Sequence, residues 1–347
     1  MNSRGVVRVG LAVTVIVVLA ISIVHAARTT VAPSTTTPTT TPVSCPTATV
    51  TVSGASALSA ALESATAGEV IDLRPGSYRG NFVIATSGTA SSPIHICGPR
   101  SAVLDGGTRQ SGYTLHISHA AFVNVSGLSI RGGQKGVVVD ASQNVTLNAL
   151  DVGDVGDEGI HLRDHSSFDL VENCVVHDTG LLHPYFGEGF YVGTARHNWD
   201  HHVPDTSNHN ELRDDVSFKT TAEGVDIKEG TSFGLLDGGH FDGTLESAVV
   251  AVINVKGTHW TIRGATVLHG PTYAIATYVI TPGSGSFNVI SHNVLSVSGA
   301  GPDIWFAQPN STQNVATCDN RTTSGSPAST SVPCLSLIHI SEPTRPY

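Results

Sequence analysis

One short phrase occurs three times in this sequence and carries the residues best suited to chemistry. It is Glu-Gly followed by alternating apolar residues, and the copies begin at Glu158, Glu188 and Glu223. Equivalent positions in successive strand repeats lie ~4.8 Å apart, and carboxylates stacked at that spacing repel one another unless a cation lies between them. Oxygen ligands suit a hard cation such as Ca²⁺. We therefore expect two or three of these glutamates to share a calcium ion.

The elements that must position these residues form a repeat of short strands. Alternating segments follow glycines at positions 112, 136, 159, 189 and 224, and the series continues at Val249 and Ala274. Two more short strands follow within a repeat, for example at 145–147 and 150–152. A recurring unit of about 25 residues, made of strand and turn, indicates a solenoid. Three strands in each turn is the arrangement of an all-β, parallel β-helix.

Strand alternation decides which side chains face solvent. The first and third residues after each glycine are apolar and should fill the interior, whereas the second and fourth should face outward. The outward set on this face contains His161, Arg163, Tyr191, Asp226 and Lys228. The two longest repeats hold loops at about 179–187 and 194–215. Insertions in a solenoid commonly gather on its binding face.

The composition agrees with this fold and excludes one class of partner. The chain of 347 residues contains 36 Gly, and only 13% of its residues are charged, which favours strands and turns over helices. The formal net charge is −10, without a basic stripe, so nucleic acid is not an expected partner. We expect one elongated domain and a monomer.

One helix is expected, near the start of the domain. Ala55, Leu58, Ala61 and Leu62 have helical spacing within residues 55–67. A strand at 69–73 and a turn at 74–78 follow. A short amphipathic helix at this place would cap the open end of the stack of strands and remove an exposed edge.

The ends of the chain differ from its body. Residues 9–27 are uncharged, so 1–27 reads as a secretion signal peptide or, if uncleaved, a membrane anchor. The Thr/Pro-rich tract 28–44 is an expected extended linker. The folded domain is expected over 45–334, outside the membrane on the exported side. Residues 335–347 depart from the compositional style and are expected to be a non-native tail.

The cysteines are consistent with an exported domain. Cys45–Cys97 and Cys318–Cys334 are the expected disulfides at the two ends, although the spacing does not by itself decide the pairing. Cys174 lies in an apolar segment, where we expect a buried thiol.

The opening of the domain resembles the right-handed parallel β-helix, or pectate-lyase-like, superfamily. The residues that carry the resemblance run from Leu58 through Gly68-Glu-Val-Ile-Asp-Leu73 to Gly76-Ser-Tyr78. They are similar to the N-terminal cap and first turn of that fold. The resemblance covers about 46–320 and implies a right-handed parallel β-helix with three strands per coil and a short N-terminal capping helix. This fold hosts lyases, hydrolases, epimerases and non-catalytic binders.

A narrower resemblance lies at the third copy of the phrase. Glu223-Gly-Val-Asp-Ile-Lys228 is similar to the Glu…Lys element of the chondroitinase B and alginate lyase group. In that group the glutamate helps to bind calcium and the lysine acts as base. The resemblance therefore implies that Glu223 is a calcium ligand and Lys228 the Brønsted base. The group also has an arginine on the next coil, whereas the segment Ala248-Val-Val-Ala-Val-Ile-Asn254 contains none.

The chemistry implied is β-elimination from an acidic polysaccharide. This reaction needs a group that neutralises the uronate carboxylate and a base that takes the neighbouring proton. The catalytic candidates are Lys228, Arg163 and His161, and the candidates for binding the sugar are Tyr191, Asp226 and Trp199. The expected metal ligands are Glu158, Glu188 and Glu223.

Two other interpretations fit the same residues. The exterior of a β-helix is polar throughout, and Glu-Gly is also good turn chemistry. The protein would then be a carbohydrate-binding protein without turnover, or a structural surface protein that displays loops on a solenoid.

Overall fold

The structure is a computed structural model that describes residues 45–336. The predicted signal peptide or anchor (1–27), the predicted linker (28–44) and residues 337–347 of the predicted tail lie outside this range. No helix within the described range is long and apolar enough to cross a membrane. Leu335, at the start of the predicted tail, donates its N–H to the carbonyl of Ala316 at 2.9 Å, so it pairs with the last coil.

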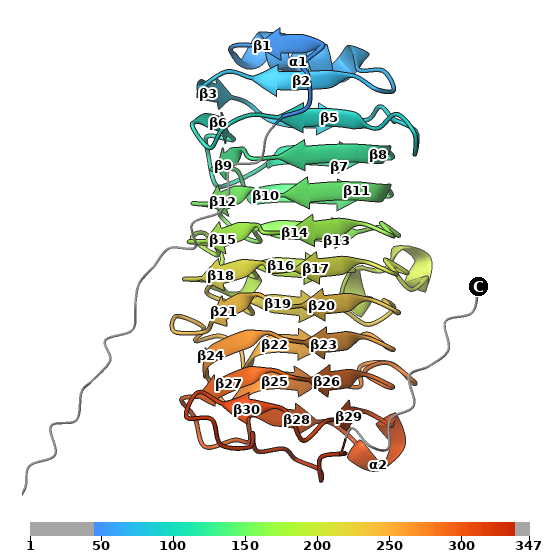
Figure 1. The fold of residues 1–347 in the computed structure, drawn as a ribbon, viewed down its shortest axis with the longest axis vertical. Coiled ribbons are helices and arrows are strands. Elements are labelled where there is room, and N and C mark those ends of the chain that lie inside the picture. The colour runs from blue at the N-terminus through green and yellow to red at the C-terminus, as the bar shows by residue number, and fades with distance from the viewer. Residues whose placement is uncertain (1–44, 337–347) are drawn as a thin grey trace, which may run out of the picture. The chain divides into compact units, whose positions relative to one another are not determined.

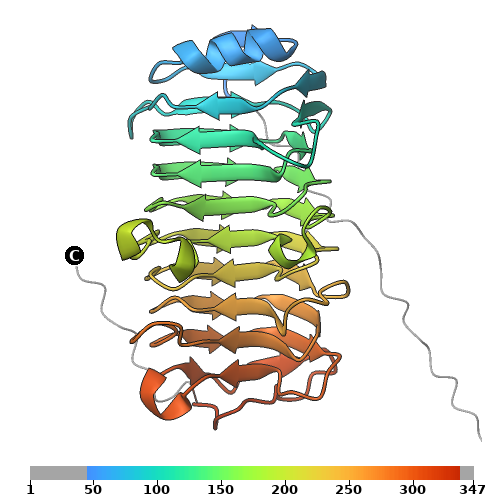
Figure 2. The same ribbon diagram turned by 180° about the vertical axis from the view of Figure 1, so that it is seen from behind.

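The described residues form a stack of coils with three strands each, and every sheet runs the length of the stack (Figures 1 and 2). The eleven-stranded sheet of the described range contains β1 Val50–Val52, β2 Val70–Leu73, β5 Ile94–Cys97, β8 Ala121–Ser126, β11 Gln143–Asn148, β14 Leu170–Glu172, β17 Glu211–Arg213, β20 Leu235–Asp237, β23 Thr261–Arg263, β26 Val289–Ser291 and β29 Val315–Ala316. The ten-stranded sheet of this range contains β3 Gly76–Arg79, β6 Ala102–Asp105, β9 Ser129–Arg131, β12 Asp151–Gly153, β15 Val175–His177, β18 Val216–Phe218, β21 His240–Asp242, β24 Thr266–Gly270, β27 Val294–Val297 and β30 Arg321–Thr322. The nine-stranded sheet, within the same residues, contains β4 Phe82–Ile84, β7 Tyr113–Ser118, β10 Lys135–Asp140, β13 Ile160–Arg163, β16 Phe190–Val192, β19 Val225–Ile227, β22 Ala251–Val255, β25 Tyr273–Thr277 and β28 Ile304–Phe306. All pairings between these strands are parallel, so the predicted parallel β-helix is confirmed.

The core lies inside the coils and consists of the apolar residues that alternation predicts. In the nine-stranded sheet, Ile160 pairs in register with Phe190, and Phe190 with Val225. All three side chains are buried in one continuous cluster. Burial of each such side chain stabilises the fold by roughly 1.5–3 kcal/mol, so the repeated interior row holds the coils in register.

The predicted repeat is wrong at two positions. Val137 pairs with Leu115, so the equivalent of Gly136 on the preceding coil is Thr114 and not Gly112. Val249 was expected to open the next coil after Gly224, but Val225 pairs with Ile253, which makes Val252 the equivalent of that glycine. Residues 244–250 instead form an inserted loop before β22. The apolar run from Ala248 to Ile253 alternates equally well in either register, and only the pairing with the preceding coil separates them.

The N-terminal helix is present and slightly shorter than predicted. α1 (Ala55–Ser64) buries Leu58, Ala61 and Leu62, and it lies at the first coil of the stack (Figures 1 and 2). The predicted turn at 74–78 is partly wrong, because β3 begins at Gly76. Tyr78 explains the difference: its ring is buried, and its hydroxyl lies 2.9 and 2.8 Å from the carbonyl oxygens of Val52 and Arg74, one of which accepts its proton. The remaining helical segments are η1 Pro184–Phe186, η2 Arg196–Asn198, η3 Asp200–His202 and α2 Pro309–Thr312.

The expected disulfides are confirmed. Cys45 is bonded to Cys97 and Cys318 to Cys334, with Cα atoms 5.7 and 5.0 Å apart. Cys174 is a buried free thiol, as expected. The two bridges therefore lie at opposite ends of the stack.

A ladder of five exposed aromatic rings lies outside the core. Phe168, His209, Phe233, His259 and Phe287 stack in that order, with centroids 4.7, 5.4, 4.7 and 4.8 Å apart. Each has a positive φ, between 56° and 61°, which is costly for a residue with a side chain. The stacking offsets this cost, because each ring is held against the ring of the coil below it.

Removing the middle ring should destabilise the fold modestly. Phe233→Ala loses two stacking contacts, each worth about 0.5–1.5 kcal/mol, so we expect the free energy of unfolding to fall by about 1–3 kcal/mol in urea denaturation. Phe233→His keeps a ring in the ladder and should lose clearly less. A matched loss of ring at Tyr185, which is 74% exposed, should change stability little. Equal losses for Phe233→Ala and Phe233→His would show that the stack does not contribute.

Candidate functional site

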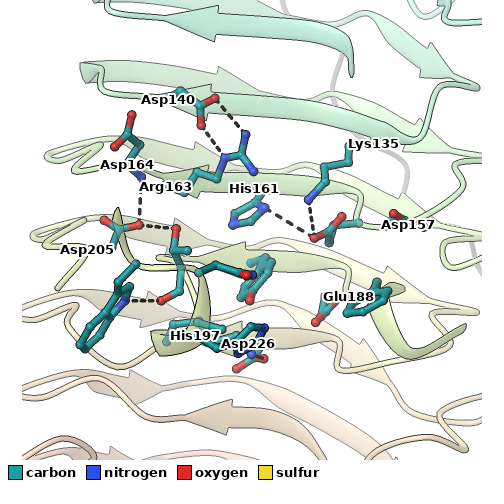
Figure 3. A pocket seen from close by; sticks show the side chains of 18 of the residues that line it. Lys135, Asp140, Asp157, His161, Arg163, Asp164, Glu188, His197, Asp205 and Asp226 are labelled. Carbon is teal, nitrogen blue, oxygen red and sulfur yellow. Dashed lines mark hydrogen bonds and ion pairs between the residues drawn. The ribbon is translucent and has the colours of Figure 1, made fainter. Parts of the chain in front are cut away.

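The candidate site is a cleft on the outer face of the nine-stranded sheet, over β10 to β19. Its volume is about 880 Å³. Residues from the two long loops, near η1 on one side and near η2 and η3 on the other, flank it (Figure 3). The two insertions that the sequence shows therefore do lie on one face.

The three glutamates of the repeated phrase stack as predicted along the edge of this cleft. The N–H of Gly159 donates to the carbonyl of Glu188, and the N–H of Gly189 to that of Glu223, both at 2.9 Å, so the three coils are in step. All three side chains are buried. Burial raises the pKa of Glu188 well above its ordinary value, and the neighbouring carboxylates Glu223 and Glu158 add to the effect.

Each glutamate has a different set of partners. Lys135, one coil earlier, donates to Glu158 at 2.6 Å. Asn254, on the following coil, donates to Glu223 at 2.9 Å. Oε2 of Glu188 and Oε2 of Glu158 are buried and have no hydrogen-bond partner among the described residues. The ladder therefore keeps unused oxygen atoms in its interior.

A fourth buried carboxylate completes the ladder and was missed by sequence reasoning. Glu246, from the inserted loop 244–250, accepts a hydrogen bond from the N–H of Gly224 at 2.8 Å. On the preceding coils a main-chain carbonyl fills this role, so the side chain of Glu246 replaces one step of the backbone ladder. Burial raises its pKa well above the ordinary value, and Glu223 contributes further. No repeat of Glu-Gly marks this residue in the sequence.

Lys228 lies on the floor of the cleft in an ion triad. Its ammonium contacts Asp226, and Lys256 contacts the other oxygen of Asp226 at 2.6 Å. Burial opposes the ionisation of Asp226, but the two ammonium groups outweigh it and lower its pKa. Burial also opposes the charge on Lys228, but Asp226 outweighs it and raises the pKa of this lysine above its usual range.

Lys256 is the second functional residue that sequence reasoning missed. It follows Val255, which pairs with Ile227, so it takes the place of Lys228 on the next coil. The absence of an arginine from 248–254 therefore does not leave this coil without a cation. A usable signal was present, because Ile253-Asn-Val-Lys256 has the pattern of Val225-Asp-Ile-Lys228. Because of the inserted loop, Lys256 lies beyond residues 248–254, the interval in which the next cation was expected.

Tyr191 lies between a histidine and a lysine. His161, on the preceding coil, stacks on its ring with centroids 4.0 Å apart, and the ammonium of Lys228, on the following coil, lies 4.7 Å from the ring centre. Because these residues come from the coils on either side, both faces of the ring are occupied. Burial raises the pKa of the Tyr191 phenol well above its ordinary value, although Lys228 opposes this.

His161 is a buried imidazole. Its Nε2–H donates to the carbonyl of Gly193 at 2.9 Å, and Nδ1 has no hydrogen-bond partner in the described part of the chain. Burial lowers its pKa well below the ordinary value, and the positive charges of Lys135 and Arg163 lower it further. The structure thus places His161 beside Tyr191, beneath the cleft surface.

Arg163 lines the cleft but is held by a carboxylate. Its Nε and Nη2 donate to Asp140 at 2.6 and 3.1 Å, and Nη2 also donates to the hydroxyl of Tyr113 at 3.0 Å. Burial opposes the guanidinium charge, but Asp140 outweighs it and raises the pKa of Arg163. Arg163 lies two coils before Lys228 on the same sheet.

Trp199 lies in the loop wall of the cleft. Its indole N–H donates to the carbonyl of Thr194 at 2.8 Å. Asp205 anchors this loop, because it accepts from the hydroxyl of Thr194 at 2.7 Å and from the N–H groups of Asp164 and His165, each at 2.9 Å. The predicted sugar-binding residue Trp199 is therefore in a braced loop that lines the cleft.

Three carboxylates are arranged so that they could hold a metal ion. Glu188, Glu223 and Asp226 each offer an oxygen atom, and these atoms lie within 4.8 Å of one another. Glu158, which the sequence predicts as a ligand, contacts Lys135 instead, and Asp226 joins the group. Oxygen donors suit a hard divalent cation such as Ca²⁺, and Glu188 keeps an unused oxygen, whereas both oxygens of Asp226 contact ammonium groups in the structure.

Comparison with known proteins places this geometry in context. Neither a family model nor a curated protein matches the chain. Among solved structures, an alginate lyase from Paenibacillus sp. str. FPU-7 superposes with a TM-score of 0.72 and 28% identity, covering 80% of this chain and 96% of that one.

Two further solved structures are more distant. Pectate lyase Pel9A gives a TM-score of 0.53 with 14% identity, over 81% of this chain and 76% of its own. The enzymatically active domain of bacteriophage CBA120 tailspike protein 2 gives 0.54 with 10% identity, over 81% and 43%. At such identities the likeness shows a shared fold. The chain thus has the parallel β-helix fold that the opening of its sequence predicts, and it shares this fold with the alginate lyase and with pectate lyase Pel9A.

Proposed function

We propose that the cleft binds an acidic polysaccharide and cleaves it by β-elimination. The observation that supports this most strongly is the register of β16, β19 and β22, which gathers Tyr191, Asp226, Lys228 and Lys256 beside the buried glutamates. Both lysines contact Asp226, and a positive charge that remains beside the cleft when Lys228 loses its proton suits the carboxylate of a uronate. Similarity to an alginate lyase over 96% of its length agrees with such a substrate.

Lys228 is the proposed proton acceptor. It must first lose its proton and leave Asp226, because an ammonium group cannot act as a base. Lys256 remains to neutralise Asp226 when that happens. Tyr191 keeps its proton because its pKa is raised. Both faces of its ring are occupied, so the hydroxyl is the part that can reach the substrate, where it donates to the oxygen of the bond that breaks.

Calcium is proposed at Glu188, Glu223 and Asp226. When bound there, it would neutralise the sugar carboxylate and, by engaging Asp226, lower the pKa of Lys228. Arg163 and Trp199 are proposed to contact the sugar chain on either side of the reacting residue, because both line the cleft. His161 is proposed to position Tyr191 through the ring stack.

Two disulfides also support secretion of the domain.

A second candidate function is binding without turnover. The observation that favours it is the ion pair of Lys228, since Asp226 raises the pKa of the proposed base. The cleft would then hold the same polysaccharide through its charges and aromatic side chains.

Incubation with defined polysaccharides separates the two. The substrates would be polymannuronate, polyguluronate, polygalacturonate and glycosaminoglycans, each with calcium and then with a chelator. Cleavage by β-elimination creates an unsaturated product whose ultraviolet absorbance is followed over time. Binding to one of these polymers with no absorbance change on any of them would reject the lyase and support the binding function. Neither binding nor absorbance would reject both.

Replacing Glu188 by Gln tests the metal site through stability. A carboxyl whose pKa is raised by folding stabilises the fold in acid, and this contribution is lost as pH rises above its ordinary pKa. Because Gln cannot ionise, we expect Glu188→Gln to be more stable than the wild type in chelator near neutral pH, by roughly 1–3 kcal/mol. The two should converge in mild acid. Calcium should raise the Tm of the wild type and leave that of the variant unchanged.

Glu211→Gln is the matched control for this experiment. Glu211 is about 40% exposed and contacts Arg213 on the eleven-stranded sheet, away from the cleft. Its substitution should leave the calcium-induced rise in Tm intact. An equal rise in the Glu188 variant would show that calcium binds elsewhere.

A further inference from the structure

Three aromatic side chains gather near the C-terminal end of the nine-stranded sheet. Tyr273 belongs to β25, Trp305 to β28, and Tyr278 follows β25 directly. The rings of Tyr273 and Trp305 stack with centroids 5.3 Å apart and 11° between their planes. Tyr278 lies 5.1 Å from Trp305 at 49°. All three are half-buried, so part of each ring reaches solvent.

This aromatic cluster stands in the same outward row as the candidate site. Asp226 pairs with Asn254, Asn254 with Ala276, and Ala276 with Trp305. Residues paired in this way point to the same side of a sheet. Three steps of ~4.8 Å place Trp305 ~14 Å from Asp226 along the stack. The cluster is therefore separate from the cleft floor yet aligned with it.

Tyr278 connects the cluster to the site. It is the next member of the row that contains Lys228 and Lys256, because the residues before each of them pair in register. Burial raises the pKa of its phenol to about 12, and Tyr273 and Glu223 add to the effect. The phenol therefore lies within the electrostatic reach of the carboxylate ladder.

The chemistry of the cluster suits a sugar chain. Tyrosine and tryptophan present an apolar ring together with a hydroxyl or N–H, which matches the C–H faces and hydroxyl groups of a sugar. The exposed ladder of Phe168 to Phe287 differs, because it consists of Phe and His rings, none of which carries a hydroxyl. That ladder also lies at the turns before the eleven-stranded sheet, off the row of the cleft.

We propose that Tyr273, Tyr278 and Trp305 form a remote sugar-binding subsite that holds the same acidic polysaccharide several residues away from Lys228. The inference rests on the proposed function of the cleft. The bound chain lies along the stack, from Arg163 at one end to Trp305 at the other. The subsite makes the protein favour long chains, since only these reach both places.

The test compares substrates of increasing length. Oligomannuronates, oligoguluronates and oligogalacturonates from dimers to octamers are offered to the wild type, Trp305→Ala and Trp305→Phe. Dissociation constants are measured with a catalytically slow variant at Lys228, and KM and kcat with the otherwise wild-type chain. Thermal unfolding of each variant reports whether it is folded. Phe287→Ala, which removes an exposed ring of the other ladder, is the matched control.

We expect Trp305→Ala to weaken binding of the longest oligomers about tenfold, the effect of losing one well-placed aromatic contact. Short oligomers should bind unchanged, kcat should hold, and Trp305→Phe should recover part of the loss. If Trp305→Ala does not fold, Tyr278→Phe tests the same subsite by removing only a hydroxyl, with a smaller loss again confined to long oligomers.

The outcomes separate the two proposals. Equal affinity of wild type and Trp305→Ala for oligomers of every length would overturn the subsite while leaving the cleft function intact. A loss of the same size for dimers and octamers would also overturn it, because it would show a general change at the cleft. Failure of the wild type to bind or cleave any of the three oligomer series or the glycosaminoglycans would reject the proposed function itself.

Discussion

Lys228→Arg should lose at least about a hundredfold in kcat/KM, because general base catalysis contributes about 10²–10⁴-fold and a guanidinium group does not lose its proton in proteins. Arginine retains the positive charge beside Asp226, so binding of substrate should change far less than turnover. The measurement is the initial rate of unsaturated product formation over a range of substrate concentrations, which separates KM from kcat.

The pH profile gives this prediction a second readout. Asp226 raises the pKa of Lys228, so the proposed lyase activity of the wild type should increase as pH rises toward alkaline values, where the lysine loses its proton. Lys219→Arg, at an exposed lysine that contacts Asp178, is the control and should retain full activity. If Lys228→Arg keeps a tenth or more of the wild-type rate, Lys228 acts as a charge and another group is the base.

The stack of glutamates could be predicted because it depends on local pattern alone. Glu-Gly recurs at Glu158, Glu188 and Glu223, and strand period 2 then decides which neighbours face inward. In a stack of parallel coils, residues that recur once per coil lie next to one another in space, so the repeat alone predicts that the glutamates are neighbours. The sheet, its interior and the positions of the two long loops follow from the same reasoning.

The ion triad could be predicted only in part, because an insertion breaks the repeat. Residues 244–250 displace β22, and Lys256 therefore lies outside the interval at which the next cation was expected. The same insertion supplies Glu246, whose carboxylate replaces a main-chain acceptor for Gly224. Because Glu246 replaces a main-chain group and not a repeated side chain, no periodic pattern in the sequence marks it.

Burial of the outward residues was the other feature beyond the reach of the sequence. His161 and Asp226 face outward by alternation, as predicted, yet both are buried where the cleft loops and neighbouring coils surround them. The pKa values of both residues are lowered, but for different reasons. Burial lowers the pKa of His161, whereas at Asp226 two ammonium groups outweigh the effect of burial. Such differences depend on tertiary neighbours and not on strand period.

Asp226→Asn should be the most destabilising substitution in the site. Asp226 is buried between Lys228 and Lys256, and removing one partner of a buried ion pair typically costs about 3–5 kcal/mol. The wild-type contribution is present above the ordinary pKa of the carboxyl, because folding lowers that pKa, and it is lost as pH falls through the folded value. We therefore expect a large loss in the free energy of unfolding near neutral pH, measured by denaturant titration. In acid the difference between wild type and variant should shrink.

The same substitution tests the proposed base, because loss of the Asp226 charge should lower the pKa of Lys228. The variant should regain stability as pH rises, once the unpaired lysine gives up its proton, and the acid side of its kcat/KM profile should shift to lower pH. Asp237→Asn is the control: Asp237 is 30% exposed and contacts Arg263 at 2.6 Å on another sheet, where a surface pair contributes at most about 1 kcal/mol. A small loss at Asp226, equal to that at Asp237, would show that the triad does not hold the cleft together. An unshifted pH profile would show that Lys228 does not set the rate.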